Sequence, residues 1–348
     1  MPRNMRDIGF ATFNLYNLQL PGEPWRGSTP YTQADYDVKV AWSAERLRAL
    51  DADVIAFQEL WSPQCLRDVF DRARLSQEYE LAFIRESGWY DIAVAAAVRA
   101  PWEIRNRRVV KDFPEGFVLR KREVDRAGGN EDPDDDIEVL IRVFSRSVLQ
   151  LTIGHRDAPE VPPIEVFAVH LKSKLPTRLD REERDRPEVN AHARALGAAL
   201  STVRRTAEAA ALRIVLNDVM RDTDVPVAVL GDYNDSPNSN TLAIVTEQPS
   251  FRFYADSRAG RTSDRGLYVA GALQALRSFR DVTYTHIYRG ERDSLDHVLV
   301  SEQFYDHSEK RLWSFRELHV WNDHVIDGDT APASDHGVVA ARFDWNPP

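Results

Sequence analysis

Cysteine is almost absent from this sequence, which holds only Cys65 among its 348 residues. A single cysteine excludes an intramolecular disulfide framework, and the lack of a CxxC pair excludes the common zinc sites. No segment approaches the roughly 18 consecutive apolar residues of a membrane-spanning helix, and the N-terminal residues lack the hydrophobic run of a signal peptide. We therefore expect a protein with no membrane span, cytoplasmic as written and secreted only if a leader has been removed.

An excess of positive charge is missing as well, because the net charge at pH 7 is −10. This balance argues against a protein that coats nucleic acid through a broadly basic surface. It does not exclude local basic contacts. An acidic site that holds a divalent metal is also compatible with it, since the metal reverses the local field for a phosphate substrate.

The chain is long and apolar enough for a large core, with 43% hydrophobic residues. It shows no repeat period and no long linker, so we expect residues 1–348 to form one domain. Residues 125–136 (DRAGGNEDPDDD) are polar, acidic and glycine-bearing, which is typical of a mobile loop. No protein partner is evident from the sequence.

Apolar periodicity predicts both helices and strands. Spacings of three and four predict an amphipathic helix over residues 37–51, residues 63–73 look helical, and residues 187–221 are typical of one or two helices. The last segment is long enough for the crossover between two parallel strands. Residues 102–124 are basic and alternate like a strand, which favours a solvated sheet edge over a phosphate contact.

The stretch PVAVLGDYNDSP, residues 226–237, joins an apolar run to polar residues. Residues 226–230 have no polar face, which predicts a strand buried on both sides. Asp232 and Asn234 follow at a spacing of two, so both side chains leave one face at the strand's carboxyl end, where open α/β sheets place their sites. The alternative is that these residues only form a turn.

Polar residues also follow other apolar, strand-like runs. A carboxylate such as Glu59, after residues 53–58, is costly unless it is paired or ligates a metal; the alternative is an exposed position past the sheet's edge. His170 alone is typical of a structural histidine, but Lys172 and Lys174 beside it favour an anion site. Five further residues stand at such positions: Asn14, Asn17, Asp296, Asp335 and His336. Together the set supplies oxygen ligands suited to Mg²⁺ or Mn²⁺ and imidazoles for phosphate and proton chemistry.

Six motifs stand in the order of a known family, from about residue 8 to residue 343: FNLYN, AFQEL, VHLKSK, LGDYNDSP, SLDHVLVS and SDHGVV. In them the chain resembles the endonuclease/exonuclease/phosphatase superfamily, which includes deoxyribonuclease I, abasic-site endonucleases, neutral sphingomyelinases and inositol polyphosphate 5-phosphatases. The motifs most resemble those of bacterial nuclease-type members. The resemblance implies a four-layer α/β sandwich, with two mixed β-sheets packed face to face and helices outside.

The resemblance also implies metal ligands and phosphate contacts. Glu59 is similar to the principal metal ligand of the family, with Asn14 and Asp335 beside it. The expected ion is Mg²⁺ or Mn²⁺, with Ca²⁺ as an alternative. The expected contacts of the substrate phosphate are Asn17, Lys172 and Lys174.

Catalytic roles follow from the same resemblance. Asp232 and Asn234 match the pair that orients the attacking water and holds a phosphate oxygen or a second metal. His336 matches the catalytic histidine, and Asp296 is similar to the carboxylate that orients it. His170 matches a histidine that sphingomyelinases and deoxyribonuclease I have at this position.

Two features depart from the family pattern. The strand DIAVAAAVR that begins at Asp91 offers no evident carboxylate partner for His170, whereas deoxyribonuclease I has a glutamate for this purpose in that region. Residues 176–190 and the acidic loop 125–136 have no obvious counterpart, so we expect 176–190 to be an insert that shapes substrate choice.

These observations predict a divalent-metal-dependent phosphodiester hydrolase, most simply a nuclease that cuts DNA, or RNA, by in-line attack of an activated water. The alternative is a small-molecule or lipid phosphodiesterase or phosphomonoesterase of the same superfamily, although no exposed apolar element for a lipid surface is evident. A third alternative, a binding module without turnover, is disfavoured by the complete set of residues from Glu59 to His336.

Overall fold

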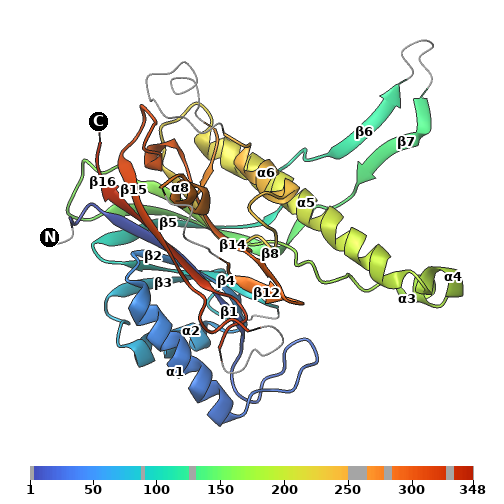
Figure 1. Cartoon of the computed structure of the whole chain (residues 1–348), viewed down its shortest axis with the longest axis horizontal. Coiled ribbons are helices and arrows are strands. Elements are labelled where there is room, and N and C mark those ends of the chain that lie inside the picture. The colour runs from blue at the N-terminus through green and yellow to red at the C-terminus, as the bar shows by residue number, and fades with distance from the viewer. Residues whose placement is uncertain are drawn as a thin grey trace.

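The computed structural model describes residues 4–87, 91–124, 131–249, 265–277, 284–326 and 333–347, with the backbone alone at 121–124 and 131–136. Two six-stranded sheets pack face to face and carry helices on their outer faces (Figure 1), so the predicted α/β sandwich is confirmed. No helix in the described ranges combines the length and apolar character needed to cross a membrane.

Each sheet is mixed. The first has the order β15 (Trp313–Trp321), β16 (Val338–Trp345), β1 (Ile8–Leu18), β2 (Val54–Leu60), β4 (Ala93–Arg99) and β3 (Tyr79–Phe83). The second has the order β11 (Tyr268–Val269), β14 (Asp296–Val300), β10 (Val227–Asp232), β9 (Ile164–His170), β8 (Val143–His155) and β5 (Trp102–Asp112). Strands β1 and β2 are parallel, as are β9 and β10, and the other pairs are antiparallel.

Helices and smaller elements complete the fold. The helices are α1 (Gln33–Leu50), α2 (Pro63–Ala73), α3 (Arg181–Arg184), α4 (Pro187–Asn190), α5 (Ala193–Met220), α6 (Asn240–Thr246) and α8 (Ala270–Arg277), with a 3₁₀ turn at Glu302–Phe304. Two small two-stranded sheets pair β6 (Leu119–Val124) with β7 (Glu131–Val139) and β12 (His286–Tyr288) with β13 (Glu291–Asp293).

The hydrophobic core has three parts that follow from the layers. Apolar residues of both sheets, such as Phe10 and Leu230, fill the space between the sheets. Helices α1 and α2 cover the outer face of the first sheet, for example through Leu47 and Phe70. Helix α5 covers the outer face of the second sheet through residues such as Leu212. This layering requires surface helices with one apolar side and strands with two apolar faces.

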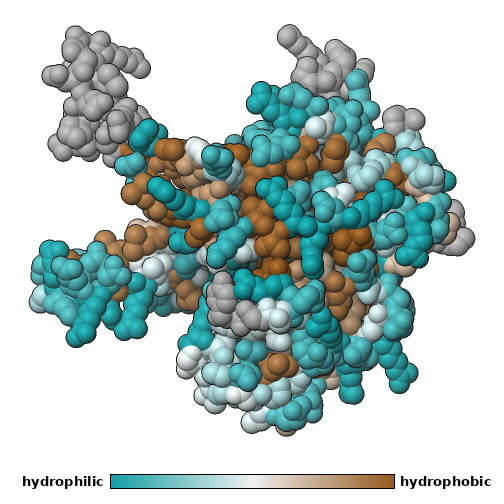
Figure 2. All heavy atoms as spheres, turned by 180° about the vertical axis from the view of Figure 1, so that it is seen from behind, coloured by the Kyte–Doolittle hydropathy of each residue, from teal (hydrophilic) through white to brown (hydrophobic). Residues whose placement is uncertain are grey.

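Some predicted boundaries are wrong. Helix α1 begins at Gln33 rather than at residue 37, because Thr32 caps it and its hydroxyl accepts a hydrogen bond from the Asp35 amide. Residues 131–136, expected in a loop, belong to β7, which pairs with β6 through its backbone regardless of side-chain charge. Residues 125–130 of the expected loop lie outside the described ranges. The predicted insert 176–190 contains α3 and α4, which lie beyond the first turn of α5 at the end of a projecting arm (Figure 1). Figure 2 shows this arm from behind, with hydrophilic residues at its end.

Strand register brings the polar ends of distant strands together. In the first sheet Asn14 of β1 lies opposite Gln58 of β2, the residue before Glu59. In the second sheet Asp232 of β10 lies opposite both His170 of β9 and Asp296 of β14. Parallel strands end at the same edge of a sheet, and an antiparallel neighbour begins there, so these residues share one edge.

The close approach of β9 to Gly231 of β10 yields a test of this register. A Cβ atom at position 231 would overlap the carbonyl oxygen and side chain of Val169. Strands β9 and β10 cannot move apart there without moving Asp232, because their pairing continues to that residue. We expect Gly231→Ala to lower the free energy of unfolding by about 1–3 kcal/mol, as overpacking does, in urea denaturation. Gly271→Ala in α8 is the matched control, because its Cβ would meet only a Val269 methyl group at 4.0 Å. Equal stability of the two variants would contradict this packing.

Candidate active site

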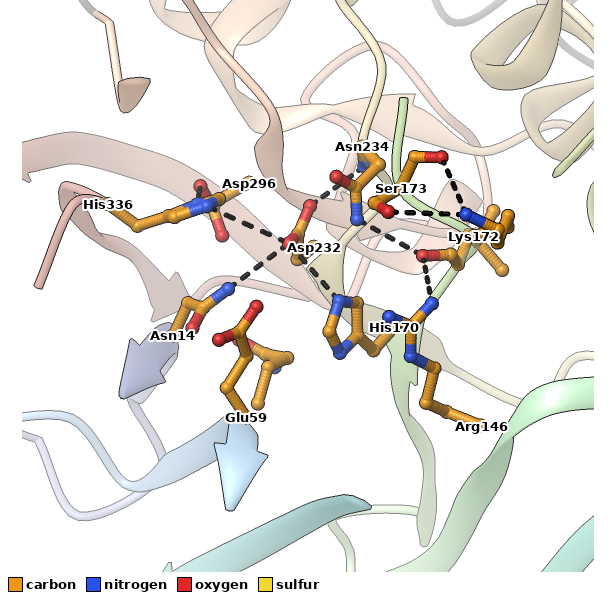
Figure 3. Close-up of polar contacts among 12 residues, drawn as sticks. Asn14, Glu59, Arg146, His170, Lys172, Ser173, Asp232, Asn234, Asp296 and His336 are labelled. Atoms are coloured by element: carbon orange, nitrogen blue, oxygen red, sulfur yellow. Dashed lines mark hydrogen bonds and ion pairs between the residues drawn. The ribbon is translucent and has the colours of Figure 1, made fainter. Parts of the chain in front are cut away.

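Side chains from both sheets converge at the edge where β1, β2, β9 and β10 end (Figure 3). The first sheet contributes Asn14 and Glu59, and the second contributes His170, Asp232 and Asp296. His336 joins them from the residues just before β16. Residues that are hundreds of positions apart in the chain therefore form one polar cluster within a fold whose strands are otherwise apolar.

Asp232 lies at the centre of this cluster and is 1% exposed. Its Oδ2 accepts a hydrogen bond from Asn14 Nδ2 at 3.1 Å, and its Oδ1 accepts one from the Asn234 backbone amide at 2.8 Å. The same Oδ2 lies 3.5 Å from His170 Nε2 and 4.0 Å from His336 Nε2. Burial, together with the negative charge of Asp296, raises the pKa of Asp232 to about 7.

His336 is held by a carboxylate behind it. Its Nδ1 donates to Asp296 Oδ2 at 2.7 Å, and its backbone amide donates to Ser334 Oγ at 3.0 Å. Burial opposes the charged imidazole, but Asp296 and Asp232 overcome that effect, so the pKa of His336 lies well above its ordinary value. His336 is therefore an imidazolium at neutral pH, with Nε2 directed toward Asp232.

His170 is in the opposite electrostatic state. It is fully buried, and burial together with the positive charges of Arg146 and His336 lowers its pKa well below the ordinary value. Asp232 is the carboxylate beside it, and the Ala-rich strand β4 carries none. Its Nδ1 has no hydrogen-bond partner among the described residues. His170 is thus a neutral imidazole, unlike His336.

Glu59 and Asp335 complete the cluster. Glu59 Oε2 accepts a hydrogen bond from the Asn17 backbone amide at 3.0 Å. Burial raises the pKa of Glu59, the imidazolium of His336 lowers it, and the nearby negative charge of Asp335 raises it again. Asp335 Oδ1 is buried without a hydrogen-bond partner in the described part of the chain, 3.9 Å from His336 Nε2. Two carboxylates that repel one another, one with an unsatisfied oxygen, leave a need for a cation.

The donor atoms fit a divalent metal. Ligand atoms of Glu59, His170 and Asp232 lie within 4.8 Å of one another. Asp335 falls in a different group, with His286 and His336, and His336 as an imidazolium has no lone pair for a metal. Carboxylate oxygens are the ligands that Mg²⁺ and Mn²⁺ prefer. Asn14, the third predicted ligand, is fully buried; its side-chain oxygen accepts from the Tyr16 amide at 2.9 Å and retains a second lone pair.

The side chains of all three predicted phosphate contacts have partners within the protein. The Asn17 side-chain oxygen accepts from Trp61 Nε1, so Asn17 meets the cluster through its backbone. The Lys172 ammonium donates to Ser173 and to the Leu175 carbonyl oxygen (Figure 3). Lys174 pairs with Asp235 and Asp293, each at 3.4 Å. Phosphate binding by these three residues remains a prediction.

Asn234 contacts Asp232 through its backbone amide rather than through its side chain. Its backbone, with φ of 53°, lets the amide reach Asp232, and its side-chain amide donates to the Leu171 carbonyl oxygen at 3.1 Å.

Three other residues near the site also have left-handed backbone: Tyr16, Asn17 and Glu59 have φ values of 47°, 51° and 61°. Such conformations cost of order 1–3 kcal/mol each and cluster where a site needs a particular geometry.

The sequence analysis missed Arg146. This residue of β8 is buried, its guanidinium donates to the Leu171 carbonyl oxygen at 3.3 Å, and it lies beside His170 (Figure 3). Its positive charge acts on both Glu59 and His170. The signal was available, because Arg146 stands between Phe144 and Val148 at alternate, buried positions of one strand.

Helix α5 supplies a second group of residues that sequence reasoning missed. The buried carboxylate of Glu208 accepts hydrogen bonds from the backbone amides of Ser145 and Lys172, both at 2.8 Å. Arg205 donates to Asp235 Oδ2 at 3.2 Å and to the Lys172 carbonyl oxygen at 3.3 Å. These bonds fix the segments that follow β9 and β10, and thereby the positions of His170 and Asp232.

Three solved structures share this fold. An endonuclease/exonuclease/phosphatase family protein from Bacteroides thetaiotaomicron has a TM-score of 0.56 and 13% identity, over 98% of each chain. A mannosyl-6-phosphatase from the same organism has a TM-score of 0.55 and 13% identity, over 97% of this chain and 100% of its own. TDP2 of D. rerio, complexed with a single-strand DNA product, has a TM-score of 0.53 and 13% identity, over 97% and 99% of the two chains.

Family membership rests on sequence. No curated protein sequence matches this chain. A sequence model of the Endonuclease/Exonuclease/phosphatase family matches residues 11–336, which includes the whole polar cluster from Asn14 to His336. The match confirms the resemblance seen in the six motifs, whereas a particular closeness to bacterial nuclease-type members remains a prediction. The chain belongs to the endonuclease/exonuclease/phosphatase family and is a hydrolase of phosphoric esters.

Proposed function

We propose that the protein is a divalent-metal-dependent phosphodiester hydrolase that cleaves DNA. The observation that carries this proposal is the buried Asp232, which stands between an imidazolium and a neutral imidazole beside two crowded carboxylates. Phosphodiesters are anionic and repel hydroxide, so their hydrolysis needs a cation, an aligned water and a group that transfers a proton.

Glu59 and Asp335 would hold the metal ion, with Asn14 beside them. When bound there, a divalent cation such as Mg²⁺ or Mn²⁺ stabilises negative charge on the phosphoryl oxygens. Asp335 Oδ1 accepts no hydrogen bond from the described residues, and the pKa of Glu59 is raised although the imidazolium of His336 lies nearby, so both carboxylates would be stabilised by a further cation.

Asp232 and His336 divide the proton chemistry. Asp232, with a pKa of about 7, is divided between its acid and carboxylate forms near neutral pH, and the carboxylate form can accept a proton from the attacking water. His336 remains protonated there, so its Nε2 can stabilise charge on the phosphoryl group or protonate the leaving oxygen. Asp296 keeps the ring in place and charged, and Asn234 holds the carboxylate of Asp232.

Positive charge near the cluster supports a nucleic-acid substrate. Arg146 lies inside the site, and the charge of exposed Arg26 acts on Arg146, His170 and Lys172. These groups provide local contacts for a phosphate backbone in a protein whose net charge is −10. The likeness to TDP2, which has been observed with a single-strand DNA product, also supports a DNA substrate.

The substrate class is tested with plasmid DNA, RNA, bis-para-nitrophenyl phosphate and para-nitrophenyl phosphate, each with Mg²⁺, Mn²⁺ or EDTA. We expect cleavage of DNA and of the synthetic diester with either metal and none with EDTA, because the carboxylates need a cation. Cleavage of the monoester alone would replace the nuclease proposal with a phosphatase. Cleavage that persists in EDTA would overturn the metal requirement.

Removal of the imidazolium tests the role of His336. We expect His336→Ala to reduce the turnover of plasmid DNA by about 10²- to 10⁴-fold, the usual contribution of a general acid. Circular dichroism should show an unchanged fold. The matched control is His192→Ala, since His192 is exposed at the start of α5 and makes no side-chain capping bond. A near-normal rate in His336→Ala would refute the role.

The pH dependence of the rate tests the pairing of His336 with Asp296. Activity should rise as Asp232 loses its proton near pH 7 and fall at the higher pH at which His336 loses its own. The negative charge of Asp296 raises both pKa values, so Asp296→Asn should shift both limbs of the kcat/KM profile to lower pH. Asp112→Asn, on the exposed edge of β5, should leave the profile unchanged. A shift to higher pH in Asp296→Asn would contradict this arrangement.

A further inference from the structure

Lys39 of α1 is a buried ammonium that makes no hydrogen bond or ion pair with any residue the structure describes. Its side chain is among the least exposed charged groups of the protein, at 4%. Its Nζ lies 5.1 Å from the ring centre of Tyr16 and 5.8 Å from that of Tyr31. Its charge is therefore in contact with the aromatic faces of Tyr16 and Tyr31.

Two carboxylates of the catalytic cluster act electrostatically on this ammonium group. The negative charges of Asp335 and Glu59 favour its charged form, although burial has the larger effect and lowers its pKa to about 8. Tyr16, whose ring it contacts, is two residues after Asn14. Burial raises the pKa of Tyr31, and the negative charges of Glu59 and Asp335 raise it further. Lys39 and its two tyrosines therefore lie near the carboxylates of Glu59 and Asp335.

Aromatic and cationic side chains extend from Lys39 to the surface. The rings of Trp25 and Tyr31 lie 4.4 Å apart, and the guanidinium of Arg26 lies 5.8 Å from the ring centre of Trp61. Trp61 is tied to the site, because its Nε1 donates to the side chain of Asn17, whose amide binds Glu59. Most of this wall belongs to the segment between β1 and α1, the blue loop below the strand ends in Figure 1.

A buried charge without a partner is costly, and contact with aromatic faces replaces only part of its lost hydration. Glu59 and Asp335 attract Lys39 at a distance, but they are also the carboxylates that fit a divalent cation. The ammonium has three donors that no described residue uses. An anion from outside the protein is the partner that would satisfy them, and flat aromatic rings suit the nucleoside that carries such an anion.

We propose that Lys39, Tyr16 and Tyr31 form a second anion subsite, which binds a phosphate adjacent to the scissile one, while Trp25 and Trp61 contact the nucleoside between the two phosphates. The proposal rests on the proposed nuclease function and specifies the substrate further. It predicts that the site binds a substrate with at least two phosphate groups rather than a simple phosphate monoester.

The test measures the binding of thymidine 3′,5′-bisphosphate, thymidine 5′-monophosphate and thymidine 3′-monophosphate by isothermal titration calorimetry. The full chain carries His336→Ala to prevent turnover, and Mg²⁺ is present. We expect the bisphosphate to bind about 10-fold more tightly than the better monophosphate, as a charge-assisted contact allows. Lys39→Met should abolish this preference, and Lys39→Arg should retain part of it.

Lys111→Met, at an exposed position of β5, is the matched control and should leave the preference unchanged. If Lys39→Met fails to fold, Lys39→Gln takes its place. The preference for the bisphosphate measured with Lys39 intact also tests the subsite without any substitution at this position. No preference for the bisphosphate with Lys39 intact would overturn the subsite. An equal loss of affinity for all three ligands in Lys39→Met would also overturn it, because it would indicate only a general electrostatic effect.

The outcome is independent of the nuclease assay. A bisphosphate preference that depends on Lys39 would support the subsite even if plasmid DNA were not cleaved, and the substrate would then be a small molecule with two phosphates. Conversely, DNA cleavage with no such preference would retain the nuclease function and remove the subsite.

Discussion

The burial of one carboxylate, that of Asp232, is the constraint on which the rest of the site depends. A carboxylate at 1% exposure is costly unless hydrogen bonds and opposite charges compensate it. The compensation comes from both sheets, because Asn14 of β1 donates to Asp232 of β10 while His336 and Asn234 approach from other segments. The same contacts that make the buried charge tolerable therefore also join the two sheets at the edge where the chemistry takes place.

The protein does not fully satisfy the buried polar and charged groups of the site, and this has a functional meaning. Asp232 retains a pKa near 7, Asp335 Oδ1 and His170 Nδ1 have no hydrogen-bond partner among the described residues, and Glu59 is close to the charge of Asp335. A protein selected for stability alone would pair or remove such groups, since unsatisfied buried polar atoms destabilise the fold. Their concentration at a single sheet edge is what a metal ion and an anionic substrate would satisfy, in agreement with the family to which the chain belongs.

The surrounding structure keeps these groups in place. Helix α5 fixes the segments after β9 and β10 through Glu208 and Arg205, neither of which faces the reacting groups. Backbone with positive φ at Tyr16, Asn17 and Glu59 orients the metal side of the site. Lys39 and Arg146 each add a positive charge to this acidic cluster, and both interact electrostatically with Glu59. An acidic protein can thus present local positive charge to a phosphate, because position within the fold matters more here than net charge.

The sequence by itself determined the fold class, the six motifs and the segments that carry most of the polar cluster, because apolar periodicity and short motifs are local properties. It did not determine which polar residues lie in contact. Arg146, Glu208 and Lys39 look like ordinary charges on a strand or helix until packing buries them, and the internal partners of the Lys172 and Lys174 ammonium groups are likewise visible only in the structure. The opposite charge states of His170 and His336 were likewise decided only by the tertiary structure, since burial and the distance to Asp296 and Arg146 set their pKa values. Such distances depend on strand order and register across the whole chain, which no local pattern specifies.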